Sequence, residues 1–199
     1  MMAVDERIKN NKEKILSLLS SVKRPGMEDL INWIDGSSDF FIAPASTRFH
    51  GNYEGGLAEH SLNVYEVFKK KCETWNIGFT EEQIIICALL HDICKANFYH
   101  KTTRNKKDEK TGQWYKYPYY ECKDEFPYGH GEKSVYIIRS FIKLNRDEAC
   151  AIRWHMGSEG EGQMGAIACS NAFNECKAAV LLHTADLEAS RILEKTIEY

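Results

Sequence analysis

The sequence lacks any run of about 18 consecutive apolar residues, the length that a membrane-spanning helix requires. Its first residues, 1–7, include three charged residues and do not resemble a signal peptide. Internal repeats and low-complexity tracts are absent as well. From these absences we expect a cytoplasmic protein that has no membrane partner.

Paired cysteines are also missing, because the seven cysteines are odd in number and form no C-x-x-C motif. A disulfide framework and a cysteine-based zinc site are therefore not expected. We expect reduced thiols, with Cys87 and Cys150 as small core residues on helices. Cys94 is the one thiol whose sequence position brings it near the candidate site described below.

The chain has no strong excess of one charge, since 26 Lys and Arg against 29 Asp and Glu give a net charge of −3. This balance provides no bulk attraction to nucleic acid, so we expect no duplex DNA or RNA partner and favour a small mobile substrate. Residues 101–110 are a local exception, with five basic residues against Asp108 and Glu109. A run of this kind is usually a solvated turn.

The sequence has the composition of an ordinary globular protein, 43% hydrophobic and 28% charged over 199 residues. We expect one domain, residues 1–199, with an all-α fold. Residues 1–38 are a helical lead-in, and residues 40–191 form the main bundle. Helical apolar spacing predicts further helices over residues 57–75, 81–92, 130–141, 145–157 and 175–194.

Local signals refine two of these helix boundaries. Thr80 and Gln83 predict a capping box before residue 81, and Asn145 with Glu148 marks another helix start. Residues 158–163 predict a flexible acidic loop.

The segment from residue 98 to residue 122 departs from the helical pattern, because aromatic and polar residues dominate it. With Lys110, Thr111 and Gly112 as the turn, it predicts a small β-hairpin inserted into the helical domain. Two roles stay open for it. It forms a lid whose aromatic side chains stack on a base, or it is an edge whose tyrosines and tryptophan pack on the bundle.

A His-Asp doublet, His91-Asp92, ends the apolar run of residues 84–90. Neither side chain is easily desolvated unless it is paired or bound to a cation, so the doublet indicates a metal site. Four more candidate ligands lie on or next to segments with helical apolar spacing: His60, His130, His155 and Asp186.

The order of these six residues resembles the HD superfamily of metal-dependent phosphohydrolases, which is named after the doublet. The resemblance covers about residues 40–191 and includes the segment Gly-Gly-Leu-Ala-Glu-His-Ser at residues 55–61. It implies an HD-domain helical bundle in which one metal takes His60, His91, Asp92 and Asp186. In the dinuclear branch, His130 and His155 would take a second metal, with Asp92 bridging.

Mixed nitrogen and oxygen ligands suit divalent transition metals such as Mn, Fe, Co, Ni or Zn better than calcium. Two such ions about 3.5–4 Å apart lower the pKa of a shared water and hold the oxygens of a displacement at phosphorus. The resemblance thus implies a phosphomonoesterase or phosphodiesterase that uses two ions and a metal-activated water. Its expected partner is a small phosphate substrate, a nucleotide or a nucleotide-like ester.

Three further residues are candidates around the metals. Lys95 follows the doublet by about one helical turn, and in HD proteins a lysine at this spacing usually faces substrate, where it would act with Asp92 in catalysis. The alternative is a solvated lysine that complements a helix dipole. Arg48 and His50 lie in a loop similar to one in the HD domains of certain exoribonucleases and relaxases. They are candidates for the substrate-binding rim, or else a surface arginine and a histidine bonded to loop backbone.

Two other functions are compatible with these residues. The mixed-valent di-iron branch, which includes myo-inositol oxygenase and a phosphonate-cleaving enzyme, has the same ligand order. Iron content with oxygen-dependent turnover would distinguish an oxygenase from a hydrolase. A non-catalytic nucleotide-binding HD module is the second alternative, and the complete ligand set argues against it. The oligomeric state is not indicated.

Overall fold

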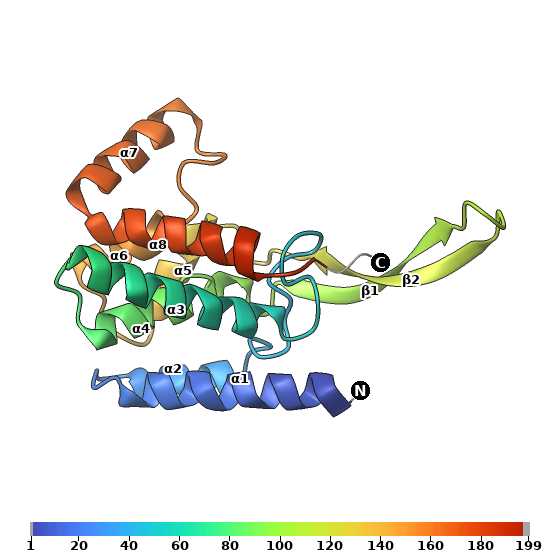
Figure 1. The fold of residues 1–199 in the computed structure, drawn as a ribbon, viewed down its shortest axis with the longest axis horizontal. Coiled ribbons are helices and arrows are strands. Elements are labelled where there is room, and N and C mark those ends of the chain that lie inside the picture. Colours follow the sequence, from blue (N-terminus) through green and yellow to red (C-terminus); the bar gives the residue numbers. More distant parts are fainter. Residues whose placement is uncertain (1, 197–199) are drawn as a thin grey trace.

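The computed structural model describes residues 2–196 and is predominantly helical (Figure 1). Its elements follow one another as α1 (Met2–Ser21), α2 (Met27–Gly36), α3 (Gly56–Trp75), α4 (Glu81–Leu90), a 3-10 turn (Ile93–Lys95), β1 (Tyr99–Lys107), β2 (Trp114–Cys122), α5 (His130–Arg139), α6 (Arg146–Arg153), α7 (Gly162–Glu175), α8 (Lys177–Glu188) and a π-helical turn (Ala189–Leu193).

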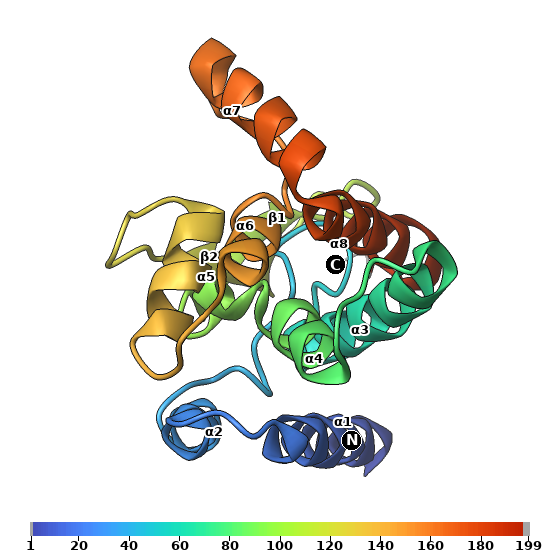
Figure 2. The same ribbon diagram turned by 90° about the vertical axis from the view of Figure 1, so that its left-hand side faces the viewer.

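Helix α4 is the centre of the bundle. All its residues from Ile84 to Leu90 are buried, as expected of a helix that is apolar on every side. It packs between α3 and α6, α8 lies on α3 and α6, and α5 packs on α6. Helices α1 and α2 lie side by side beneath this bundle (Figure 2). Among the described residues, no helix has both the length and the apolar character that crossing a bilayer requires.

The capping box predicted at Thr80 is present, and the helix start predicted at Asn145 also forms a capping box with Glu148. The helices that they start are shorter than predicted, because α4 ends at Leu90 rather than at residue 92, and α6 ends at Arg153 rather than at residue 157. The Nδ1 of His91 bonds the Ala88 carbonyl at 2.7 Å, and this is the acceptor that the next backbone N–H would need to continue the α-helix. The same competition ends α6 near His155.

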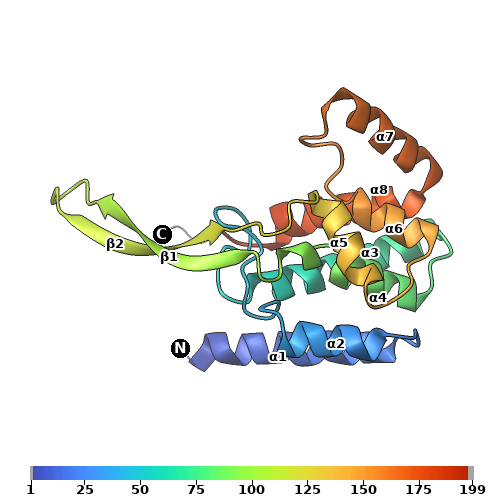
Figure 3. The same cartoon turned by 180° about the vertical axis from the view of Figure 1, so that it is seen from behind.

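The inserted hairpin is confirmed. Strands β1 and β2 pair antiparallel from Tyr99↔Cys122 to Lys107↔Trp114. The Asp108 carboxylate accepts hydrogen bonds from the backbone N–H groups of Lys110 and Thr111, which fixes the turn. The hairpin extends away from the bundle (Figures 1 and 3), and Trp114 near its tip is 70% exposed. The expectation that this tryptophan packs on the bundle was therefore wrong.

The C-terminal region differs most from the sequence prediction. Residues predicted as a loop up to 163 already enter α7 at Gly162, and α7 points away from the bundle (Figure 2). Cys176, in extended conformation, separates α7 from α8. The predicted helix over residues 175–194 is thus α8 followed by the π-helical turn.

A buried ion pair joins the N-terminal helices to the bundle. The Arg24 guanidinium, in the link between α1 and α2, donates to both carboxylate oxygens of Glu148, with Nη1–Oε2 at 2.7 Å. The Glu148 side chain is fully buried and also completes the α6 capping box with Asn145. Removing the arginine would leave a buried carboxylate without its counter-charge.

We expect Arg24→Met to lower the free energy of unfolding by about 3 kcal/mol, the typical cost of breaking a buried ion pair on one side. Urea unfolding measures this change. The matched control is Arg146→Met, whose exposed pair with Asp147 should contribute little to stability. Equal losses of unfolding free energy in the two variants would contradict the role of Arg24 in joining the N-terminal helices to the bundle.

Candidate metal centre

The six predicted ligands come from five helical segments and converge on one buried cluster. His60 lies in the first turns of α3, His91 and Asp92 follow α4, and His155 follows α6; all four side chains are buried. The remaining two are His130, the first residue of α5, and Asp186 on α8. Their side chains are 35% and 14% exposed, so the cluster reaches solvent on their side.

The Asp92 carboxylate is at the middle of the cluster, and its two oxygens face different partners. Oδ2 lies 3.5 Å from Nε2 of both His60 and His91. Oδ1 lies 2.7 Å from Nε2 of His130 and 3.4 Å from Nε2 of His155. This is the arrangement that a carboxylate needs to serve two cations at once.

The buried histidines direct their Nε2 atoms inward, because each Nδ1 is bonded elsewhere. Nδ1 of His91 bonds Ala88 O, Nδ1 of His155 bonds Ile152 O at 2.6 Å, and Nδ1 of His60 bonds Glu194 at 2.8 Å. A ring that donates from Nδ1 presents the Nε2 lone pair to a metal.

A metal ion fits this donor set. Nε2 of His155 is buried without a hydrogen-bond partner, and buried polar atoms are rarely left so. Nε2 of His60 and Nε2 of His91 are only 3.2 Å apart, and Asp186 completes a group of ligand atoms within 4.8 Å of one another. His155 forms a second such group with His91 and Asp92.

The electrostatics of the metal-free cluster follow from burial and charge pairing. Burial lowers the pKa of the His60 ring, but its bonds to Asp186 and Glu194 outweigh this and raise the pKa to about 10. Burial lowers the pKa values of His91 and His130. Burial raises the pKa of Asp92, yet Lys95 and the surrounding imidazoles hold that pKa well below its ordinary value. The pairing with ionised carboxylates therefore favours the imidazolium form of His60.

Glu194 is a member of the site that sequence reasoning missed. Its side chain is 1% exposed, with Oε1 bonded to His60 and Oε2 bonded to His50 at 2.7 Å. Asn63 donates to Oε1 at 3.2 Å. The only sequence signal is a spacing of eight residues from Asp186, about two helical turns. That spacing places Glu194 on the Asp186 face only if an α-helix continues to residue 194, whereas a π-helical turn over Ala189–Leu193 follows α8.

The other candidate residues lie at different positions relative to the cluster. Lys95 lies inside the cluster, where its ammonium is 2.6 Å from Oδ2 of Asp92. The His50 ring contacts the His60 ring in a tilted arrangement, with 4.7 Å between ring centroids. Arg48 is exposed and lines a cavity beside the hairpin, with no clustered histidine in its lining. The Cys94 thiol lies 3.5 Å from Nδ1 of His130, and burial raises its pKa to about 12.

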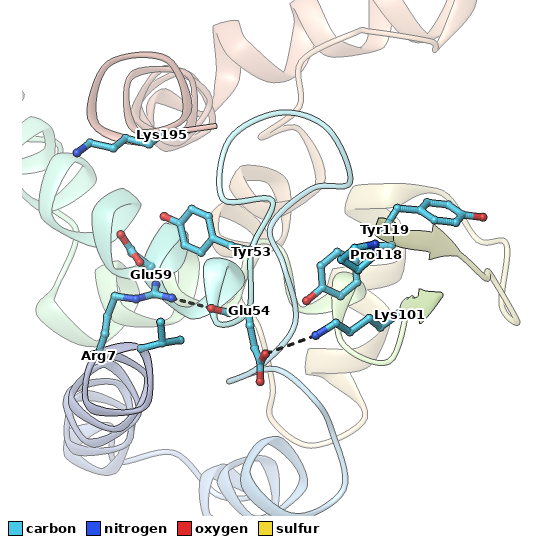
Figure 4. A pocket seen from close by; sticks show the side chains of 10 residues that line it. Arg7, Tyr53, Glu54, Glu59, Lys101, Pro118, Tyr119 and Lys195 are labelled. Carbon is cyan, nitrogen blue, oxygen red and sulfur yellow. Dashed lines mark hydrogen bonds and ion pairs between the residues drawn. The ribbon is translucent and has the colours of Figure 1, made fainter. Parts of the chain in front are cut away.

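A cavity of about 360 Å³ opens beside the cluster, lined by Lys95, Phe98, Tyr99, His130 and Lys133 among others. A different cavity, of about 470 Å³, lies between α1 and the base of the hairpin (Figure 4). Arg7, Glu59 and Tyr53 line it, and none of the clustered imidazoles does. Of these two cavities, the one beside Lys95 borders the cluster.

Helices that deliver histidines and carboxylates to one buried point define a candidate metal centre. The HD domain family model matches residues 57–189, and the chain belongs to this family. Among curated proteins it is similar to the dihydroneopterin 2′,3′-cyclic phosphate phosphodiesterase of Methanocaldococcus jannaschii, with 32% identity over 103 residues. The match covers 48% of this chain and 39% of the relative. No solved structure matches the chain.

In the metal-free protein, we expect His60 to remain an imidazolium up to a pH of about 10, since its pKa is raised from 6.5. Asp186→Asn removes an anionic acceptor, so the His60 pKa should fall and the ring should lose its proton at lower pH. Nitrogen-15 NMR of the histidine side chains measures this titration. Asp147→Asn, on an exposed residue, is the control, and a His60 pKa equal in all three proteins would contradict the assigned pairing.

Proposed function

We propose that this protein is a metal-dependent phosphohydrolase that cleaves a nucleotide-like phosphate ester. One observation carries the proposal: the two oxygens of Asp92 face two separate sets of imidazoles. One divalent transition metal would take His60, His91, Asp92 and Asp186. A second would take His130, His155 and the other oxygen of Asp92. When bound, such ions acidify a water and neutralise phosphoryl oxygens.

We assign Lys95 to substrate binding. Burial lowers the pKa of its ammonium, but Asp92 and neighbouring groups outweigh this and raise it above its ordinary value, so Lys95 stays charged. It borders the cavity beside the cluster, next to His130. From there its ammonium can donate to a phosphoryl oxygen and stabilise the negative charge that develops on it.

The same cavity supports a substrate with an aromatic ring. Phe98 and Tyr99 line it beside Lys95, with ring centroids 4.9 Å apart. A planar base packed on these rings would leave its phosphate directed toward Lys95 and the cluster. The relative's name describes a phosphodiesterase for a cyclic phosphate of a pterin, which is also a planar heterocycle. Its chemistry supports a phosphate ester on a ring-bearing compound.

Glu194 is assigned to holding the metal ligands. Its carboxylate accepts from Nδ1 of His60 and so directs Nε2 into the cluster. His50 binds the other oxygen, and we assign it to the support of Glu194 behind His60. Carboxylates in this position fix the orientation of a metal-binding imidazole and increase its basicity.

Manganese-loaded protein should release product from at least one member of a panel of nucleotides, dinucleotides and cyclic phosphates. Asp92→Ala should abolish this activity, because both ligand sets lose their shared oxygen donor. Asp147→Ala, at an exposed site, should retain it. Phosphate or nucleoside release, measured by chromatography, decides the outcome. If no compound in the panel is turned over, or if the Asp92→Ala variant is active, the hydrolase proposal is wrong. The next experiment would then test iron-loaded protein under oxygen.

Glu194→Gln should weaken metal binding by about 10- to 100-fold, the usual cost of losing a supporting partner of a metal ligand. Isothermal titration with manganese or zinc measures the affinity, and thermal unfolding shows whether the fold persists. Glu188→Gln is the matched control, because Glu188 lies in the same region but pairs with Lys71 at 2.6 Å. The assignment fails if both variants bind metal as the parent does.

A further inference from the structure

The hairpin arm, residues 99–122, extends away from the bundle, and within residues 2–196 no second layer covers its outer part (Figures 1 and 3). A two-stranded hairpin alone is marginally stable in water, so exposed aromatic side chains on it need a reason. The arm has six aromatic residues among its 24. Near its tip, Trp114 is 70% exposed and Tyr115 is 44% exposed.

Charge is segregated between the arm and the rest of the chain. The arm has six basic and three acidic residues, a net charge of +3. Subtracting these from the totals of 26 and 29 leaves 20 basic and 26 acidic residues elsewhere, a net charge of −6. The small net charge of the whole chain is therefore the sum of a positively charged arm and a negatively charged body. An anionic partner would be attracted to the arm and repelled by the bundle.

The strand register gathers tyrosines and cations on one face of the arm. Thr102, Arg104 and Lys106 are opposite Tyr119, Tyr117 and Tyr115, respectively. Paired residues of antiparallel strands point to the same side, so these six side chains share one surface, the tyrosine face. The Arg104 guanidinium lies 3.9 Å from the Tyr119 ring centroid, and the Lys106 ammonium lies 5.7 Å from that of Tyr117.

A cavity of about 700 Å³ lies where the tyrosine face meets the loop before α3. Arg48 lines it from the loop, and Arg104 and Lys106 line it from the arm. Tyr117 and Tyr119 supply aromatic surface, and Glu121 is the one acidic residue among the described residues that line the cavity. Three cations beside two tyrosine rings match a chain that alternates phosphates with planar bases.

We propose that the tyrosine face and this cavity bind single-stranded nucleic acid, with bases on the tyrosines and phosphates on Arg48, Arg104 and Lys106. Stacking on aromatic side chains beside a basic track is the general mode of single-strand binding. Duplex does not fit, since its bases are already stacked and its breadth would meet the negative body. An anionic membrane surface does not fit either, because the face has hydroxyl-bearing tyrosines rather than large aliphatic residues.

This inference is independent of the metal centre, because binding needs neither a metal nor turnover. It also gives Arg48 a partner, although the residue does not line the cavity beside the metal cluster. His50 lies two residues after Arg48 in the same loop, and its ring contacts the ring of His60. A bound strand would therefore pass beside the segment that supports the metal ligands.

The test is fluorescence anisotropy of labelled 20-nucleotide oligo-uridine and oligo-thymidine with the full-length protein at about 50 mM salt, where phosphate contacts are strongest. A denaturing gel of the recovered oligonucleotide shows that it is intact. We expect binding that weakens with salt, with duplex of the same length binding at least tenfold more weakly. No binding of either single strand, or equal binding of duplex, overturns the proposal.

Variants locate the surface. Arg104→Glu/Lys106→Glu should weaken binding at least tenfold and flatten the salt dependence by about two phosphate contacts. Lys70→Glu/Lys177→Glu makes the same charge change on exposed residues of the body and should leave affinity within twofold. Equal loss in both double variants would mean general electrostatics and overturn the proposal.

Two measurements keep the result interpretable. Arg48→Glu changes the loop without altering the strands, so a several-fold loss in this variant cannot come from an unfolded arm. Sedimentation shows whether the arm instead joins two copies of the chain. A dimer that Arg104→Glu/Lys106→Glu dissociates, with no oligonucleotide bound by the parent, would assign the tyrosine face to self-association and overturn the proposal.

Discussion

The buried carboxylate of Asp92 is the constraint around which the helical bundle is arranged. An ionised carboxylate is costly to bury unless charges and donors surround it. Here one ammonium and four imidazoles do so, brought by α3, α5 and the segments that follow α4 and α6. Each of these segments must begin or end at a position from which its side chain can reach the Asp92 carboxylate. The apolar packing of α4 then places the carboxylate at the centre of the protein rather than at its surface.

The hydrogen bonds that orient the site are also the bonds that end its helices. His91 and His155 each bond the backbone carbonyl three residues earlier, which takes an acceptor from the helix and frees Nε2 for the cluster. Glu194 performs the same task for His60 from the other end of the chain. The tail that carries Glu194 is held in turn by a backbone bond from Gly51 to Lys195. The position at which these helices end, the position of the C-terminal tail and the orientation of the imidazoles therefore depend on the same set of hydrogen bonds.

Charge is distributed to suit a site of this kind. The body of the protein is negative, and its positive groups near the cluster are few and specific, with Lys95 bonded to Asp92 and Lys133 beside the cavity. The hairpin arm holds an excess of the opposite sign. A phosphate-bearing ligand of the proposed kind would thus be attracted along these surfaces and repelled by the rest of the body, which would favour one orientation.

The sequence by itself determined the helical class, the hairpin and the residues of the cluster. Those signals are short-range patterns or the order of residues along the chain: polar helix starts at Thr80 and Asn145, aromatic alternation near residues 114–120, and a His-Asp doublet with candidate ligands before and after it. Only the tertiary structure decided that Glu194 rather than Glu188 supports His60, that Arg48 belongs to the hairpin side, and where α4, α6 and α8 end. These outcomes depend on contacts between residues far apart in the chain, such as the 134 positions that separate His60 from Glu194. Periodicity and propensity describe only neighbours, so they carry no information about such contacts.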